Sequence, residues 1–337
     1  MTNQKNISSS NLITKLTALW AVSESGLGGI FHAMKLPFTG LILGSFAVMI
    51  VTFIALNSEK KFRAILQATL IVILIKAIAS PHSPFTAYVA VMFQGVIGAV
   101  IYSLFKVSNF SAVLYGIIAL LESALQKLLM MVLIFGVNIW EAFQEFFQGL
   151  AKQFNMQSLV HLPWLIVGIY CFAYLIGGIL AGISAVKLPE AIQKEALQIR
   201  DETIDFDETN STPKKRKSKT RFIGLAFILF FIVTVFVFSG SFNKAMYALL
   251  RTLGAIALLF FVVNPLFKYF LGRWKDSQKL KKQKQLNNVL EFVPEFKSFA
   301  GKARIIASKE TTNYKKLRKF VLTWMALALY HQNESKL

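Results

Sequence analysis

The chain has few of the residues that soluble enzymes use for chemistry. Its 337 residues include one cysteine, Cys171, and four histidines. A single cysteine excludes an internal disulfide and a cysteine-based metal cluster, and its apolar surroundings favour a small packing residue. The sequence contains no Walker A motif, no GxGxxG in a strand–helix context and no GxSxG. We therefore expect no P-loop ATP hydrolysis and no enzymatic activity.

Acidic residues are also scarce. The chain holds 17 aspartates and glutamates against 37 lysines and arginines, which gives a formal net charge of +20. In a soluble protein such a charge would point to nucleic acid. Here 55% of the residues are hydrophobic, the mean hydropathy is +0.54, and the basic residues gather in the connections and the tail. This distribution predicts a polytopic helical membrane protein with no nucleic-acid partner.

Long apolar runs dominate the sequence, whereas strand patterns and internal repeats are absent. Most of these runs reach the roughly 17–25 residues that a membrane-spanning helix needs. The sequence therefore predicts an all-α fold with about eight transmembrane helices and a cytoplasmic helical tail. The predicted spans are 12–34, 38–56, 64–80, 84–105, 110–135, 161–186, 222–241 and 246–271.

Lysine and arginine in the connections predict the orientation of these spans. With the N-terminus inside, the inner connections carry most of the basic residues, among them Lys60, Lys61 and Arg63. The outer connections hold only three lysines. Because basic residues favour the cytoplasmic side, we expect a multi-pass protein of the inner membrane with both termini in the cytoplasm.

Composition changes along the chain predict four parts: a six-helix membrane bundle (1–187), a charged cytoplasmic linker (188–221), a two-helix membrane hairpin (222–271) and basic amphipathic cytoplasmic helices (272–337). The linker is expected to be partly disordered, because an acidic patch precedes a basic block without apolar periodicity. The tail helices fit either the inner leaflet with its anionic lipids or another protein.

The first span and the corner after it form the most informative stretch. Glu24 lies inside an apolar run, where an ionisable side chain costs roughly 2.5–3.5 kcal/mol on insertion scales. Gly26, Gly28 and Gly29 follow, and His32 comes next. These glycines predict a close helix-packing face for a partner subunit or, alternatively, contact with a ligand.

Glu122 is a second carboxylate inside an apolar span. Glu24 and Glu122 could line a polar cavity and bind a cation, an amine or a substrate hydroxyl. Alternatively, each carboxylate is paired with a polar group of a neighbouring helix, such as Lys76, Lys127 or Gln94. The sequence leaves both interpretations open.

Three of the four histidines, His32, His82 and His161, fall at the membrane face predicted to be the outer one. Three imidazoles and a carboxylate would make a plausible transition-metal site. Histidines are also ordinary at a membrane interface, and no two of these have the i, i+4 spacing. A bound metal ion is therefore an open alternative, and no other cofactor is expected.

Several short segments of the first 186 residues contain small, polar or proline residues within or between the apolar spans. They are Ser23–Gly29, Leu36–Gly40, Gly44, Ser83–Tyr88 and Gln94–Ala99. With the six predicted spans, residues 12–186 resemble the substrate-binding S components of energy-coupling factor (ECF) transporters. The resemblance implies an outward pocket for a vitamin or a transition-metal ion. It also implies contact with a T component through small-residue faces of the first helices.

The C-terminal part, 222–337, is similar in layout to the end of an ECF T component. In T components, apolar spans are followed by basic cytoplasmic helices that dock on ATPases and carry short Ala-Arg-Gly motifs. This chain has only the segment AGKAR, Ala300–Arg304, in that region. The similarity implies ATPases as partners and Arg304 as a residue of their interface.

These observations favour a membrane subunit of a micronutrient uptake transporter that binds a vitamin or metal ion in an outward-facing pocket. The alternative is a non-transporting membrane scaffold that recruits a cytoplasmic partner or anionic lipid through its basic tail. The residues expected to line the pocket are Glu24, His32, Thr39, His82, Tyr88, Gln94 and Glu122.

Overall fold

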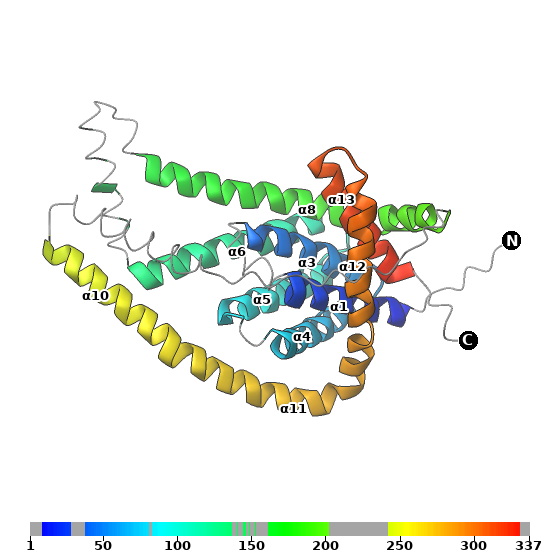
Figure 1. Ribbon diagram of the computed structural model, residues 1–337, viewed down its shortest axis with the longest axis horizontal. Helices are drawn as coiled ribbons and strands as arrows, with labels where there is room; N and C mark the ends of the chain where they lie inside the picture. Colours follow the sequence, from blue (N-terminus) through cyan, green and yellow to red (C-terminus); the bar gives the residue numbers. More distant parts are fainter. Residues whose placement is uncertain are drawn as a thin grey trace. The chain divides into compact units, whose positions relative to one another are not determined.

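The computed structural model describes most of the chain, and it contains no strand among the described residues. These are residues 9–27, 38–80, 83–136, 140, 144–145, 148, 152, 161–201 and 242–330. The predicted all-α class is confirmed for them. The elements (Figure 1) are α1 (Ser9–Val22), the π-helix η1 (Ser23–Leu27), α3 (Thr39–Leu56), α4 (Lys61–Ala79), α5 (Phe85–Leu104), α6 (Asn109–Phe135), α8 (Leu162–Asp201), α10 (Phe242–Leu258), the π-helix η3 (Leu259–Val263), α11 (Asn264–Leu290), α12 (Val293–Ser308) and α13 (Asn313–Tyr330).

Six helical stretches among the described residues are long and apolar enough to cross a membrane, which indicates a membrane-embedded protein. They are Thr39–Leu56, Lys61–Ala79, Phe85–Leu104, Asn109–Ile134, Leu162–Ile199 and Leu250–Gln278. The helices α3, α4, α5 and α6 begin and end within about three residues of the predicted spans, because the length of an apolar run is a local property of the sequence.

Other predicted elements are only partly covered. The first predicted span is helical as far as Leu27, and its remainder, 28–34, lies outside the described residues. The predicted span 222–241 lies outside them as well, as does the disorder predicted for about 201–219 apart from Asp201, which is the last residue of α8. Helix α8 extends to Asp201, so the first residues of the predicted linker continue the sixth helix.

The described residues divide into two compact units. The first takes its residues from 1–124, 173–203 and 267–337, and the second takes its residues from 125–172 and 204–266. Helices α6 and α8 contribute to both units, as does the continuous helix α10–η3–α11. Three of these boundaries fall within long helices, and the fourth, between 203 and 204, falls in the predicted linker.

Helix α3 is the best-buried span of the first unit. Protein atoms bury 67% of the Thr39–Leu56 stretch, compared with none of Leu250–Gln278. Within this unit α3 contacts α1, α4 and α5, and α4 packs along α5. The apolar surface that the other spans leave uncovered suits lipid contact, since a chain in a membrane need not bury every apolar face.

Helices α6 and α8 cross with their backbones in contact in the first unit. A Cβ atom built on Gly116 would collide with the carbonyl oxygen of Gly178, and one built on Gly182 would lie 2.5 Å from the carbonyl oxygen of Ala112. Ala112 and Gly116 on α6, like Gly178 and Gly182 on α8, stand four residues apart. This is the small-xxx-small pattern that lets membrane helices approach closely.

Replacing Gly178 with valine should separate α6 from α8 and lower the thermal stability of the protein. Overpacking costs typically about 1–3 kcal/mol, and the atoms that a larger side chain would meet here are backbone atoms, which cannot rotate away. Gly168→Val is the matched control on the same helix, because nothing lies within 4 Å of its Cβ position. Thermal unfolding in detergent measures both variants. Equal losses in both would contradict the close crossing.

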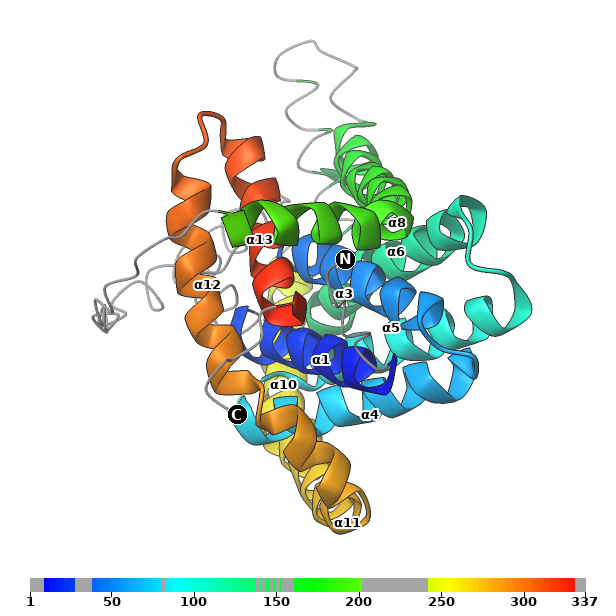
Figure 2. The same ribbon diagram turned by 90° about the vertical axis from the view of Figure 1, so that its right-hand side faces the viewer.

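Helices α12 and α13 form an antiparallel C-terminal hairpin (Val293–Tyr330) that belongs to the first unit and packs there mainly on α1 (Figures 1 and 2). The second half of α13, from Thr323 to Leu329, is buried. Part of the tail surface that the sequence assigned to a lipid or protein partner thus contacts the chain's own bundle.

Trp324 is the main anchor of the C-terminal hairpin. Its ring stacks on Phe46 of α3 with centroids 5.7 Å apart, and its Nε1 donates a hydrogen bond of 2.8 Å to the carbonyl oxygen of Phe296. The Nζ of Lys15 on α1 donates a 3.0 Å hydrogen bond to the carbonyl oxygen of Leu329. The stacking and the lysine bond tie the hairpin to α3 and α1, and the indole bond joins the two helices of the hairpin.

A carboxylate of α8 provides a second attachment. Glu195 is buried, and it accepts a 2.6 Å hydrogen bond from the hydroxyl of Thr323 and pairs with Lys319 at 3.0 Å. One buried carboxylate thereby receives two donors from α13, which offsets the cost of removing its charge from water.

Candidate functional site

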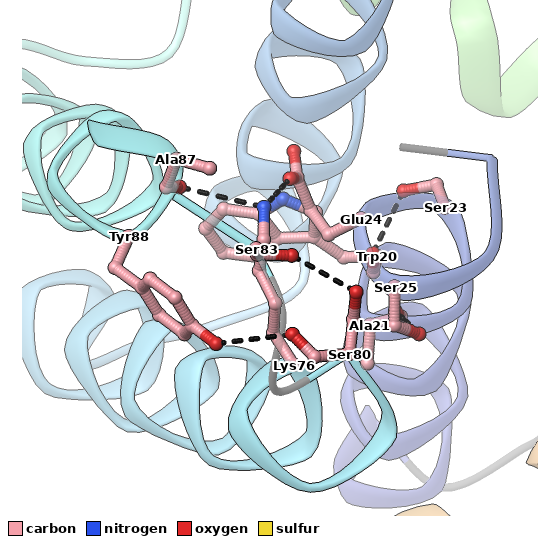
Figure 3. Close-up of polar contacts among 10 residues, drawn as sticks. All are labelled: Trp20, Ala21, Ser23, Glu24, Ser25, Lys76, Ser80, Ser83, Ala87 and Tyr88. Carbon is pink, nitrogen blue, oxygen red and sulfur yellow. Dashed lines mark hydrogen bonds and ion pairs between the residues drawn. The ribbon is translucent and has the colours of Figure 1, made fainter. Parts of the chain in front are cut away.

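A buried ion pair occupies one end of the first unit. Nζ of Lys76, near the end of α4, lies 2.7 Å from Oε2 of Glu24 in η1 (Figure 3). The two side chains are 3% and 5% exposed. Of the alternatives left open by the sequence, the structure therefore contains the pairing of Glu24 with Lys76. Such a pair avoids the cost of a lone charge in an apolar interior.

Lys76 makes further contacts with the start of α5. Its Nζ donates a long hydrogen bond of 3.4 Å to the carbonyl oxygen of Ala87 and lies 6.0 Å from the ring centroid of Tyr88. The Tyr88 hydroxyl donates to the carbonyl oxygen of Ser80 at 3.3 Å, and the hydroxyls of Ser80 and Ser83 lie 2.9 Å apart. The ammonium is thus held between η1, the α4–α5 corner and an aromatic face.

Trp20 stands four residues before Glu24, about one helical turn away, and is drawn with this pair in Figure 3. The side chain is completely buried, and its Nε1 has no hydrogen-bond partner among the described residues. A buried donor without a partner costs roughly 1–3 kcal/mol. Such an unpaired group in a native structure calls for an explanation, and a bound acceptor is one.

The π-helix η1 sets the position of Glu24. Helix α1 changes from α to π geometry at Ser23, and the hydroxyls of Ser23 and Ser25 donate to the carbonyl oxygens of Trp20 and Ala21 at 2.7 and 2.6 Å. These bonds lie where the helix changes from α to π geometry. Single π turns of this kind occur frequently at functional sites.

A second polar group lies deeper, between α3, α5 and α6. Gln94 is 3% exposed, and its Oε1 has no hydrogen-bond partner among the described residues. Its Nε2 is 3.5 Å from the position that a Cβ on Gly44 would take. The backbone carbonyl oxygen of Gln94 accepts a 3.0 Å hydrogen bond from the hydroxyl of Tyr115. No contact described here joins Gln94 to the Glu24–Lys76 pair.

The other residues predicted for the pocket are spread over the first unit. Thr39 is buried at the start of α3, and Glu122 of α6 is half-buried with no hydrogen-bond partner for its Oε2 among the described residues.

Two residues of the predicted partner interfaces are also described. Gly26 has open space at its Cβ position, so the described residues show no close packing there. Arg304 is exposed on α12.

The predicted metal site cannot be assembled from the described residues. His32 and His82 lie outside them, as do Gly28 and Gly29 of the predicted partner interface, and His161 is exposed at the start of α8. Within the described part, no three His, Cys, Asp or Glu side chains are arranged to hold a metal ion. The metal site stays a prediction.

A polar cavity of about 540 Å³ lies at the other end of the first unit. It is lined by the start of α1, the α3–α4 turn with Lys60, part of α4 and part of α11, and its walls include the amides Asn57, Gln67, Gln285 and Asn288. We name this the basic end, after Lys60, Lys61 and Arg63. Lys60 and Lys76 are separated by about 24 Å along α4.

No family model matches the chain, and neither the curated proteins nor the solved structures gave a significant match.

Proposed function

We propose that the protein is the substrate-binding membrane subunit of a bacterial micronutrient uptake transporter, of the ECF S-component type. The observation that carries this proposal is the buried Glu24–Lys76 pair, with the unpartnered indole N–H of Trp20 about one helical turn before Glu24. Ionisable groups inside apolar spans are costly, and they usually mark substrate or ion sites. A ligand with an acceptor oxygen would engage the free indole donor and recover its desolvation cost.

The ion pair favours an organic solute over a metal ion at this position. The ammonium of Lys76 lies 2.7 Å from the carboxylate of Glu24, so a cation placed there would meet a positive charge of the same sign. A solute with hydrogen-bond acceptors would instead be attracted by Lys76 and Trp20. The aromatic ring of Tyr88 adds a flat apolar wall to the same site.

We place the ion-pair end on the outer side of the inner membrane and the basic end in the cytoplasm. The support is the positive-inside tendency of Lys60, Lys61 and Arg63 in the α3–α4 connection. The C-terminal hairpin, with Lys315 and Arg318 exposed, packs through α1 and α8 and fits the same side. Both termini are then cytoplasmic.

A thermal-shift screen of the purified protein against vitamins and divalent metal ions tests the proposal. A ligand present at 100 times its Kd should stabilise the folded state by about 2.7 kcal/mol, which appears as a higher Tm. The double variant Glu24→Met/Lys76→Met should lose this shift, whereas Gln67→Ala, in the cavity of the basic end, should keep it.

Three outcomes separate the alternatives. An organic ligand whose shift depends on Lys76 supports the proposal. A shift with divalent metals alone would move the substrate class to metal ions. If no compound stabilises the protein and none co-purifies with it, the binding function fails, and the membrane scaffold that recruits a cytoplasmic partner takes its place.

A further inference from the structure

The turn of the C-terminal hairpin and the helix ends beside it form a strongly basic surface. Residues 304–318 hold five basic side chains against one acidic side chain, for a net charge of +4. Glu310 is the acid, and the bases are Arg304, Lys309, Lys315, Lys316 and Arg318. We name residues 304–318 the hairpin tip. Apart from Lys316, which is half-buried, its basic residues are exposed.

Three large apolar side chains of the hairpin tip are exposed among these charges. Ile305 is 56% exposed, Leu317 is 59% exposed and Tyr314 is 73% exposed. The same two helices bury their apolar residues well elsewhere: Phe299 on α12 and Trp324 on α13 are 4% and 1% exposed. The uncovered apolar side chains of α13 are thus concentrated in its first turns, beyond the reach of the bundle.

The attachment of α13 explains why the tip extends from the bundle. The first contacts of this helix with the bundle come from Lys319 and Thr323, which bind Glu195 of α8, and its end is fixed by Lys15 of α1. The helix therefore passes across the bundle from α8 to α1, and the residues before Lys319 project beyond α8. Figures 1 and 2 show α12 crossing the direction of α1 and α4.

This placement matches the geometry of a membrane surface. If the spans stand across the bilayer, a hairpin that crosses them at one end lies along the plane of the headgroups. Lysine and arginine interleaved with exposed apolar side chains are typical of segments that bind anionic lipids, since the charges meet the headgroups and the apolar side chains enter the acyl boundary. A tip of net charge +4 is complementary to such a surface.

We propose that the hairpin tip is a docking surface for anionic phospholipids of the leaflet at the basic end. Arg304, Lys309, Lys315 and Arg318 contact the phosphate groups, and Tyr314 and Leu317 insert at the interface. The lipid holds the tip against the membrane, while the buried half of α13 holds the same hairpin against the bundle. This docking is independent of the substrate pocket.

The test places a fluorescent probe next to the hairpin tip in the full-length protein. In a Cys171→Ser background, Thr312→Cys in the exposed turn is labelled with an environment-sensitive fluorophore. The protein is reconstituted in nanodiscs of phosphatidylcholine with increasing phosphatidylglycerol. The emission should shift to the blue as the anionic lipid increases, and raised salt should reverse the shift, because salt screens exposed charges.

Charge removal at the tip should weaken the response. The variant Lys309→Gln/Lys315→Gln/Arg318→Gln should need more phosphatidylglycerol for half of the shift, since each basic residue near an anionic surface is worth about a fivefold change in binding. The control Lys275→Gln/Lys282→Gln/Lys284→Gln removes the same charge from α11 and should leave the response nearly unchanged. Melting curves in detergent establish that both variants are folded.

Two results would overturn the proposal. A probe that responds equally in phosphatidylcholine and in phosphatidylglycerol has no anionic requirement. A probe that does not respond to either lipid shows that the tip does not reach the membrane.

Discussion

Lys76→Met alone should destabilise the protein by about 3–5 kcal/mol, whereas Glu24→Met/Lys76→Met should restore most of that loss. Removing one partner leaves an uncompensated charge in an apolar interior, but replacing both by apolar groups of similar volume is often neutral or stabilising by about 1–4 kcal/mol. The near-complete burial of both side chains is the reason for the size of the effect. Unfolding in detergent, followed by thermal or denaturant titration, measures it.

The exposed pair Lys275–Asp276 provides the control for this prediction. Its charged atoms lie 3.9 Å apart and its side chains are 31% and 74% exposed, so Asp276→Asn should change stability by no more than about 1 kcal/mol. If the Glu24 and Lys76 single variants and their double variant lose stability additively, the two groups are not coupled. The pairing described here would then be incorrect.

The double variant also separates folding from function. The Glu24–Lys76 pair contributes little net stability if the apolar replacement folds equally well, so its presence in the protein would need another reason. Loss of ligand-induced stabilisation in a well-folded double variant would supply that reason. A double variant that still responds to the ligand would assign the pair to packing specificity alone.

Trp324→Ala should cost about 3–5 kcal/mol and should release the C-terminal hairpin from the bundle. Replacing a large buried aromatic residue by alanine leaves a cavity in addition to the lost burial. At this site the stacking on Phe46 and the hydrogen bond to Phe296 disappear together. Faster limited proteolysis at the basic residues of α12 and α13, together with a lower Tm, measures the release.

Leu317→Ala on the same helix is the matched control, because Leu317 is 59% exposed and should cost little in detergent. Trp324→Phe gives a finer comparison. It keeps the stacking but removes the indole donor, so it should cost about 0.5–1.5 kcal/mol, the net value of one hydrogen bond, because the carbonyl of Phe296 keeps its helical partner within α12. Wild-type protease resistance in Trp324→Ala would mean that the hairpin does not depend on this anchor.

The sequence predicts the spans α3 to α6 well, because the length of an apolar run and the breaks between runs are local features. It also predicts that Glu24 must be paired or line a cavity, since its cost in an apolar interior is intrinsic. The identity of its partner, Lys76, depends on how η1 packs against α4. No local sequence pattern predicts that packing. Trp20 stands four residues before Glu24, and this helical spacing places both residues on one face of the helix. The sequence could therefore have pointed to Trp20 as well.

The docking of the C-terminal hairpin shows what helical periodicity leaves undecided. The apolar groups around Trp324 correctly indicate an amphipathic helix, but amphipathicity does not say what covers the apolar face. The same pattern is compatible with cover by a membrane, by another protein or by the chain's own bundle. The crossing at Gly116 and Gly178 is similar: the glycines on α6 and α8 are visible in the sequence, but their pairing is a tertiary fact.

The bond between Lys15 and Leu329 joins residues 314 positions apart. During synthesis the first helix therefore leaves the ribosome long before the segment that covers it exists, and loop closure over such a separation is slow. Until α13 has been synthesised, Phe46 and the neighbouring surface of α1 stay uncovered. A chain that stopped before α13 would keep the helices of the bundle but expose this surface permanently, which gives cellular proteases a way to recognise it.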